Sequence, residues 1–253
     1  MREYIIAGNW KMNVLDGENS AKFVTEFKAK KGVTAVLCPT FLHIGFLSAL
    51  ADRLGKPKIL FGAQNVSEYT DGAYTGEVSA TMIADIGAKF VIVGHSERRA
   101  LFGETDEIVN RKARAVLNAR LRPIICVGET LEQRERGETR EVLQRQTTAA
   151  IQGLSVSELE CVIFAYEPIW AIGTGRVASP EDAAAGAEAI FSASDAIAAA
   201  GSPILYGGSM TENNAAEILA RQEISGGLIG GASLDPVKFG KIVEIASQLA
   251  VGK

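Results

Sequence analysis

Eight short apolar runs recur along the chain, and a helix-like stretch follows each of them. The runs are Tyr4–Ala7, Thr34–Leu37, Ile59–Phe61, Phe90–Val93, Ile124–Val127, Cys161–Phe164, Ile204–Tyr206 and Gly227–Ile229. They are continuously apolar rather than alternating, which is typical of strands buried on both faces of a parallel sheet. The pattern therefore predicts parallel strands joined by helices.

Helix starts can be recognised between the runs. Ser179 offers an N-cap, Pro180 a first-turn residue, and Glu181 and Asp182 negative charge near the positive helix end. Thr105 and the pair Asp235–Pro236 begin helices in the same manner. After Pro180 the spacing predicts one helix face made of Ala183, Ala187, Ile190, Phe191, Ser194, Ile197 and Ala198.

Eight strand-helix units in 253 residues predict an α/β fold, the eight-stranded parallel (β/α)8 barrel. An open doubly wound sheet is the alternative, but it usually needs fewer strands, and no Gly-x-Gly-x-x-Gly follows the first run. No linker, low-complexity tract or internal repeat divides the chain. We therefore expect a single barrel domain over residues 1–253.

Composition narrows the function classes. A formal net charge of -4 provides no basic footprint for nucleic acid or an acidic membrane surface. No apolar stretch reaches the roughly 18 residues of a membrane helix. With two histidines and no Cys-x-x-Cys or His-x-x-x-His spacing, we expect neither a metal nor a cofactor.

The cysteines and the first residues bear on location. Cys38, Cys126 and Cys161 are odd in number and lie inside or beside apolar runs, so a disulfide framework is not expected. The chain enters a strand-like run at Tyr4 without the regions of a signal peptide. We expect a reduced, cytoplasmic protein.

Polar residues stand where barrel chemistry is expected, at the carboxyl ends of strands. Asn9 and Lys11 follow the first run, His95 the fourth and Glu167 the sixth. Each alone is more often a solvated or structural residue. Together they predict that an ammonium, an imidazole and a carboxylate meet at one rim.

Five motifs then resemble one family. The stretches AGNWKMN, VGHSERR, AYEPIWAIGTG, YGGSM and LIGGASL are similar to those of triosephosphate isomerases, in the same order and at similar spacing. The resemblance covers the chain from Tyr4 to the last helix. It implies interconversion of dihydroxyacetone phosphate and D-glyceraldehyde 3-phosphate by moving one proton through an enediolate.

The resemblance also implies the role of each residue. Glu167 would be the base and Lys11 a fixed positive charge held by Glu97. The resemblance implies that His95 is a neutral electrophile. A helical turn beginning at Ser96 would disfavour a second positive charge on the imidazole, whereas Glu97 would favour it. Asn9 would contact the substrate.

The same resemblance places a phosphate site and a packing residue. Glycine-rich stretches follow the last two runs, where backbone N–H groups of such barrels often bind phosphate. Ser209, Gly230 and Gly231 would hold the phosphate, although two tight strand-helix turns would read similarly. Cys126 matches a family cysteine near the base, and we expect it to support Glu167 by packing.

The apolar segment after Glu167 predicts a movable lid. Its residues are Pro168, Ile169, Trp170, Ala171, Ile172, Gly173, Thr174 and Gly175. Pro168 and the glycine end would be hinges, and closure would bring the Gly173 N–H to the phosphate and expel water around Glu167. An ordinary buried loop would explain the apolar residues but not the glycines on one side.

The long segment Gln64–Val78 predicts an assembly contact. It is about as long as unstructured loops usually become, and it carries Tyr69 and Tyr74 around a turn. In the family the corresponding loop inserts into a second subunit. We therefore expect a homodimer in which Thr75 helps to position Lys11 and His95 across the interface.

Two other readings stay open at this point. A sugar-phosphate epimerase is another phosphate-binding barrel, but that class typically carries metal ligands for which this chain lacks histidines. A non-catalytic barrel scaffold would predict loss of Lys11, His95 or Glu167, and all three are present.

Overall fold

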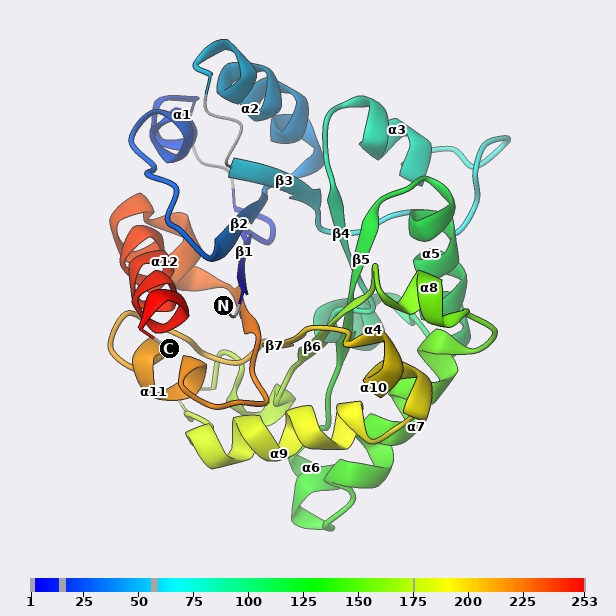
Figure 1. The fold of residues 1–253 in the computed structure, drawn as a ribbon. Helices are drawn as coiled ribbons and strands as arrows, with labels where there is room; N and C mark the ends of the chain where they lie inside the picture. The colour runs from blue at the N-terminus through cyan, green and yellow to red at the C-terminus, as the bar shows by residue number, and fades with distance from the viewer. Residues whose placement is uncertain (1–2, 14–16, 56–58, 175, 253) are drawn as a thin grey trace.

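The computed structural model describes residues 3–13, 17–55, 59–174 and 176–252. Its eight strands form one closed, all-parallel barrel in chain order, with helices around the outside (Figure 1), so the predicted (β/α)8 barrel is confirmed. The strands are β1 (Tyr4–Asn9), β2 (Val33–Cys38), β3 (Ile59–Ala63), β4 (Phe90–Val93), β5 (Arg122–Val127), β6 (Ile163–Tyr166), β7 (Ile204–Tyr206) and β8 (Gly226–Ile229).

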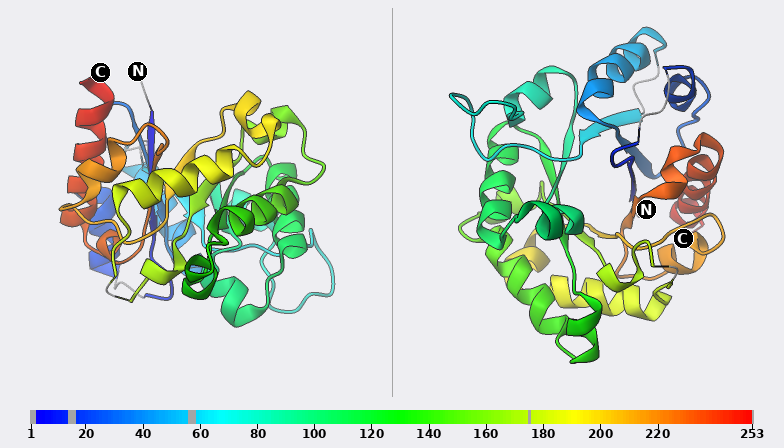
Figure 2. Two further views of the ribbon diagram at one scale, coloured as in Figure 1. Left: turned by 90° about the horizontal axis from the view of Figure 1, so that it is seen from below. Right: turned by 180° about the vertical axis from the view of Figure 1, so that it is seen from behind.

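The barrel closes where the first and last strands meet. β1 pairs with β2 from Tyr4↔Val33 onward, and on its other edge with β8 from Ile5↔Gly226 onward. Because every pairing is parallel, all eight carboxyl ends reach one rim of the barrel. The side and rear views show the helices enclosing the strands on all sides (Figure 2).

Strand residues alternate between two apolar cores. In β1, Ile5 and Ala7 point into the barrel interior, whereas Tyr4 and Ile6 pack in the layer between strands and helices. Both faces of each strand are therefore buried, which explains why the runs are apolar without alternation.

The helices complete the outer layer. In the described residues these are α1 (Gly17–Thr25), α2 (Phe41–Arg53), α3 (Ala80–Asp85), α4 (Ser96–Phe102), α5 (Asp106–Asn118), α6 (Leu131–Glu135), α7 (Thr139–Ile151), α8 (Val156–Leu159), α9 (Pro180–Phe191), α10 (Asp195–Ala200), α11 (Ala215–Leu219) and α12 (Pro236–Val251), with short 3-10 helices η1 (Ile169–Ala171) and η2 (Gly231–Leu234). The predicted N-caps Ser179, Thr105 and Asp235 all accept hydrogen bonds from backbone N–H groups of their helices.

Two sequence expectations need correction. The single helix predicted after Pro180 is two helices, because Ser194 leaves the helical path and caps a new one by accepting from the Ala196 N–H at 3.2 Å. Phe191 and Ala198, placed on the buried stripe, are exposed. The sixth strand begins at Ile163 rather than Cys161, whose side chain is also exposed.

Two further features of the fold are a long loop and the character of its helices. The segment 64–79 contains no helix or strand and extends away from the barrel rim between β3 and α3 (Figures 1 and 2). Among the described residues, no helix combines the length and the apolar character that crossing a bilayer requires.

Candidate active site

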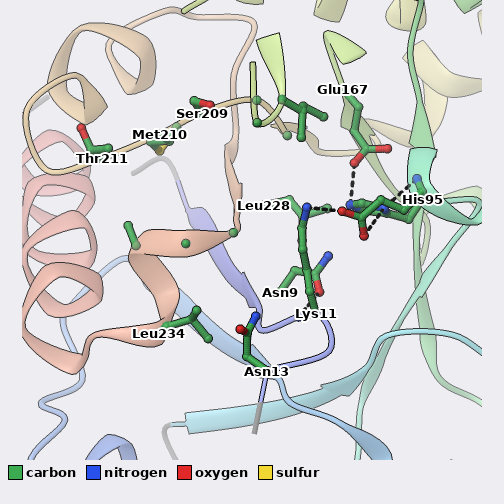
Figure 3. A pocket seen from close by; sticks show the side chains of 18 residues that line it. Asn9, Lys11, Asn13, His95, Glu167, Ser209, Met210, Thr211, Leu228 and Leu234 are labelled. Carbon is green, nitrogen blue, oxygen red and sulfur yellow. Dashed lines mark hydrogen bonds and ion pairs between the residues drawn. The ribbon is translucent and has the colours of Figure 1, made fainter. Parts of the chain in front are cut away.

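A cavity of about 450 Å³ opens at the carboxyl ends of the strands (Figure 3). Its walls come from loops that follow β1, β4, β6, β7 and β8. Ten predicted site residues line it, namely Asn9, Lys11, His95, Glu97, Glu167, Ile172, Gly173, Ser209, Gly230 and Gly231. The closed barrel therefore brings together side chains that lie more than 150 positions apart in the sequence.

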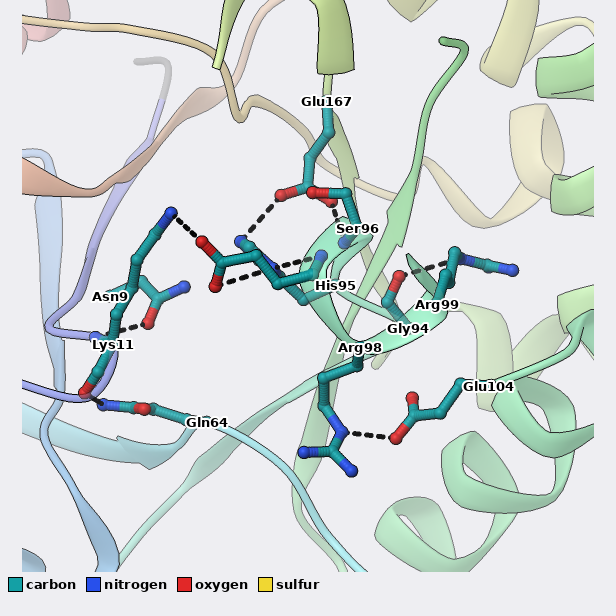
Figure 4. A network of polar contacts seen from close by, with 11 residues as sticks. Asn9, Lys11, Gln64, Gly94, His95, Ser96, Arg98, Arg99, Glu104 and Glu167 are labelled. Atoms are coloured by element: carbon teal, nitrogen blue, oxygen red, sulfur yellow. Dashed lines mark hydrogen bonds and ion pairs between the residues drawn. The ribbon is translucent and has the colours of Figure 1, made fainter. Parts of the chain in front are cut away.

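Lys11 is held in an uncommon backbone conformation. Its φ of 51° lies in the left-handed region, which a residue with a Cβ adopts only when its surroundings enforce it. The Lys11 N–H donates to Asn9 Oδ1 at 3.0 Å, and Gln64 Nε2 donates to the Lys11 carbonyl at 2.9 Å (Figure 4). Its Nζ donates to Glu97 Oε1 at 2.5 Å, so the ammonium is fixed at the cavity wall.

His95 caps helix α4, and this contact determines which ring nitrogen carries the proton in the neutral imidazole. Its Nδ1 accepts a hydrogen bond from the Glu97 backbone N–H at 3.2 Å. In the neutral imidazole the proton must then sit on Nε2. The positive end of α4 faces this ring, as the sequence predicted.

Glu167 is almost completely buried, with 1% of its surface exposed. Its Oε2 accepts from the Ser96 backbone N–H at 2.8 Å, and its Oε1 lies 2.9 Å from His95 Nε2. The Glu167 backbone is fixed as well, because its N–H donates to the Val127 carbonyl of β5 at 2.8 Å.

The two catalytic candidates influence each other electrostatically. Burial alone lowers the pKa of the His95 imidazole, but the adjacent Glu167 carboxylate and, more weakly, Glu97 outweigh it. The net effect raises the pKa of His95 above its ordinary value. In this arrangement the neutral state expected from the family is therefore opposed by the position of Glu167.

Cys126 lies inside the barrel next to the base and does not line the cavity. Burial, and then the neighbouring Glu167 carboxylate, raise the pKa of the Cys126 thiol well above its ordinary value. Such a thiol stays protonated, and only thiolates are good nucleophiles.

The loops after β7 and β8 form the opposite wall. Gly207, Gly208, Gly230 and Gly231 line it. The 3-10 helix η2 begins at Gly231, as expected for a turn that directs N–H groups toward an anion. The Ser209 hydroxyl donates to the Ala171 carbonyl at 3.0 Å, so it joins this wall to the segment after Glu167.

The predicted lid is anchored at one end and open at the other. Trp170 is buried, donates its indole N–H to Glu129 Oε1 at 2.8 Å, and lies beneath the Arg134 guanidinium at 4.1 Å. Ile172 and Gly173 line the cavity, and Gly173 has a φ of 69°, which favours glycine. Gly175, the last predicted hinge residue, lies outside the described residues.

Sequence reasoning missed several residues that hold the site. The Ser96 N–H and the amide of Gln64 support Glu167 and Lys11 directly, and Glu129 binds the lid. Gln64 directly follows β3, and Glu129 follows β5 after Gly128, so the strand-end rule applied to all eight strands would have found both. Ser96 contributes its backbone, for which no side-chain signal exists.

Within residues 3–13, 17–55, 59–174 and 176–252, no three His, Cys, Asp or Glu side chains are grouped as a metal ion would require.

Comparison with known proteins agrees with the motifs. The family model described as triosephosphate isomerase matches residues 4–246. The chain is similar to proteins named triosephosphate isomerase from Nitrosococcus oceani (47% identical over 97% of this chain and 100% of the relative), Thiobacillus denitrificans (46%, over 98% and 100%) and Alkalilimnicola ehrlichii (48%, over 97% and 99%). The match is near full length in both directions, and the motifs and the cavity fall within it. The chain therefore belongs to the triosephosphate isomerase family.

Proposed function

We propose that this protein interconverts dihydroxyacetone phosphate and D-glyceraldehyde 3-phosphate through an enediolate, with Glu167 as the base and His95 as the neutral electrophile. One observation carries the proposal: a single cavity of about 450 Å³ gathers Lys11, His95 and Glu167 from three different strand ends. Its glycine-lined wall faces these three residues and suits a phosphate.

The reaction needs a base because a proton beside a carbonyl is a weak acid. In this structure the Glu167 carboxylate lies against the Ser96 N–H and His95 Nε2. We propose that bound substrate turns it from these partners toward the reacting carbon. It then takes the proton from one carbon and returns it to the neighbouring carbon, which is general acid–base catalysis by one group.

The charge that develops on the enediolate oxygens needs donors already in place. His95 Nε2 faces the cavity and donates a proton in hydrogen bonding, while Lys11 supplies a fixed positive charge. Such preorganised donors usually contribute several kcal/mol to transition-state stabilisation.

The protonation state of His95 follows from the movement of Glu167. Glu167 is the strongest of the groups that raise the pKa of this imidazole above its ordinary value. When the carboxylate turns to the substrate, that influence weakens, and burial, Lys11 and the α4 end, which favour the neutral ring, then oppose Glu97, the weaker of the two carboxylates. Substrate binding therefore produces the neutral donor.

The lid completes the site. Ile172 and Gly173 lie at the cavity edge, and Ser209 links the lid to the loop after β7. Closure brings the Gly173 N–H to the phosphate and excludes water from Glu167, which protects an enediolate that would otherwise lose its phosphate.

A coupled assay tests the proposal. The wild-type protein, given glyceraldehyde 3-phosphate, turns it over equally with and without a chelator, and Glu167→Gln lowers kcat by about 10³-fold or more, within the range of general-base catalysis. Chelator-sensitive turnover would favour the epimerase reading. An inactive wild-type protein would favour the scaffold.

The proposal includes a homodimer that completes this site. Met12, Leu101 and Phe102 are 94%, 73% and 65% exposed, and they surround a second hollow of about 390 Å³. That hollow is also lined by Lys11 and His95, so an occupant would contact the back of the catalytic residues. An apolar patch of this kind is typical of a protein interface.

The extended loop of a second copy is the occupant that we assign to this hollow. Residues 71–77 are all exposed, and the loop extends from the rim (Figure 2). Tyr69 and Tyr74 stiffen it by stacking at 3.9 Å between ring centroids. Thr75 lies in its exposed part and is the residue that reaches Lys11 and His95 of the other subunit.

Analytical ultracentrifugation of Thr75→Arg tests the dimer. Insertion of a charge into a close interface dissociates the dimer and lowers kcat, whereas Thr148→Arg on the exposed side of α7 changes neither. A monomeric Thr75→Arg protein with full activity would contradict the dependence.

A single catalytic domain and a cytoplasmic location belong to the same proposal. One closed barrel contains every strand of the described residues. All three cysteines are free thiols, including the exposed Cys161, which suits a reducing compartment.

A further inference from the structure

Three consecutive carbonyl groups at the carboxyl end of β5 accept hydrogen bonds that hold this end of the strand in place. The Cys126 carbonyl accepts from Arg99 Nη2 at 3.3 Å, and the Val127 carbonyl accepts from the Glu167 N–H at 2.8 Å. The Gly128 carbonyl accepts from Gln146 Nε2 at 3.0 Å. The strand that precedes Gly128 is thus connected directly to the backbone of the proposed base.

Gln146 makes two hydrogen bonds to the same residue. Besides donating to the Gly128 carbonyl, its Oε1 accepts from the Gly128 N–H at 2.8 Å. Gln146 is buried on α7, so both bonds are shielded from water. These two hydrogen bonds fix the position and the orientation of the Gly128 backbone. Without them the N–H and the carbonyl of Gly128 would both be buried without partners, which is costly.

Gly128 in turn is in direct contact with Glu167. A Cβ built on Gly128 would lie 1.8 Å from the Glu167 carbonyl oxygen and 3.1 Å from the Glu167 Cβ. The backbones of the two residues therefore touch without space for even a methyl group. Any shift of Gly128 must move the backbone that carries the Glu167 side chain.

We propose that Gln146 is a positioning residue for the base: it holds Gly128, and Gly128 sets where the Glu167 carboxylate can reach. The inference rests on the proposed role of Glu167. Gln146 does not line the cavity, so its effect reaches the reaction through Gly128. Proton transfer depends steeply on such placement, because misplacement by about 1 Å can cost roughly 10²-fold in rate.

The primary test is Gln146→Met, which keeps the length of the side chain and removes both hydrogen bonds. We expect kcat to fall by about 10- to 100-fold, as for a misplaced base, while KM stays within about twofold. The isotope effect on kcat with dihydroxyacetone phosphate deuterated at C1 rises, because proton transfer becomes slower than the other steps. Partial unfolding would lower kcat but leave this isotope effect unchanged.

Gln144→Met is the matched control. Gln144 lies on the same helix and donates to Ser192 Oγ at 3.3 Å, away from β5. This variant keeps the wild-type kcat and isotope effect. If Gln146→Met does not fold, Gln146→Glu replaces it, since the carboxylate still accepts from the Gly128 N–H but loses the donor to its carbonyl, and we expect a smaller fall in kcat with the same rise in the isotope effect.

The outcomes separate the inference from the proposed function. A folded Gln146→Met or Gln146→Glu protein with unchanged kcat and isotope effect overturns the positioning role, provided that Glu167→Gln is inactive in the same assay. An active Glu167→Gln protein overturns the assignment of the base itself.

Discussion

Two lysine–glutamate pairs in this protein have the same geometry and opposite surroundings. Lys11 and Glu97 meet at 2.5 Å between Nζ and Oε1 at the cavity wall, with side chains 31% and 46% exposed. Lys112 on α5 and Glu104 in the loop before it meet at the same distance, with side chains 7% and 4% exposed. The distance between charges therefore does not reveal what a pair does.

The number of partners distinguishes the two pairs. Glu104 Oε1 also accepts from Arg98, and Lys112 also donates to Asn65 at 2.7 Å, so protein groups occupy both charges. Lys11 has one charged partner among the residues that the structure describes, and its ammonium faces the cavity. When a buried pair loses one member, the other charge is left buried and unpaired, which destabilises the fold, whereas an exposed pair contributes little to stability. We infer that the buried Lys112–Glu104 pair (the inner pair) stabilises the fold, and that the Lys11–Glu97 pair at the cavity wall (the outer pair) serves the reaction.

Lys11→Met separates the two roles most strongly. We expect kcat/KM to fall by about 10²–10³-fold, or roughly 3–4 kcal/mol of transition-state stabilisation, because a fixed charge at the substrate is lost. The free energy of unfolding changes by less than about 1 kcal/mol. Steady-state kinetics and urea unfolding measure the two effects, and a large loss of stability with intact activity would reverse the assignment.

Lys112→Met is the counterpart in the buried pair. Removal of this cation leaves Glu104 with Arg98 alone, and we expect the free energy of unfolding to fall by about 3 kcal/mol. The melting temperature falls by roughly 10 °C for a chain of this size. kcat per folded molecule stays near the wild-type value, so an inactive but fully stable variant would contradict the comparison.

The contribution of Glu104 to stability depends on pH, and this dependence tests the same difference between the two pairs. Burial alone raises the pKa of the Glu104 carboxyl, but hydrogen bonds from Lys112 and Arg98 outweigh it, and the net pKa lies below the ordinary value of 4.5. Its stabilisation is therefore fully present above that value and is lost as the pH falls through the lowered pKa.

Glu104→Gln provides the measurement. The variant lacks this titrating group, so its free energy of unfolding falls less steeply than that of the wild type below pH 4.5. Other carboxylates titrate equally in both proteins, and the difference between the two urea unfolding series isolates Glu104. Parallel curves would show that the inner pair does not depend on this charge.

Glu97→Gln has the smallest expected effect. The exposed pair contributes about 0–1 kcal/mol, so the free energy of unfolding changes little. Lys11 is still held through its backbone by Asn9 and Gln64, and we expect kcat/KM to fall by only about tenfold or less, far below the Lys11→Met effect. A fall as large as that of Lys11→Met would mean that Glu97 itself takes part in the reaction.

The fold and the main site residues could be predicted because their signals are local. Apolar runs specify buried strands, and a residue within two positions of a strand end, such as Lys11 or Glu167, is placed at the rim by the barrel itself. The inner pair could not be predicted, since Glu104 lies in the loop before α5 and meets Lys112 only because that loop places its carboxylate beside the helix. The break at Ser194 was missed because the apolar spacing continues across it, and only the capping hydrogen bond shows where one helix ends.

The contacts that support the site could not be predicted from the sequence either. Gln146 meets Gly128 and Ser96 meets Glu167 through backbone groups, whose positions depend on strand register and not on residue type.

Exchange of substrate protons with solvent tests the central claim most directly. Dihydroxyacetone phosphate incubated with enzyme in deuterium oxide is followed by NMR at C1, together with C2 of the product. The wild-type protein should introduce deuterium at both carbons, and Glu167→Gln should introduce almost none although it still binds the substrate. Exchange by Glu167→Gln at the wild-type rate would contradict the assignment of this carboxylate as the base.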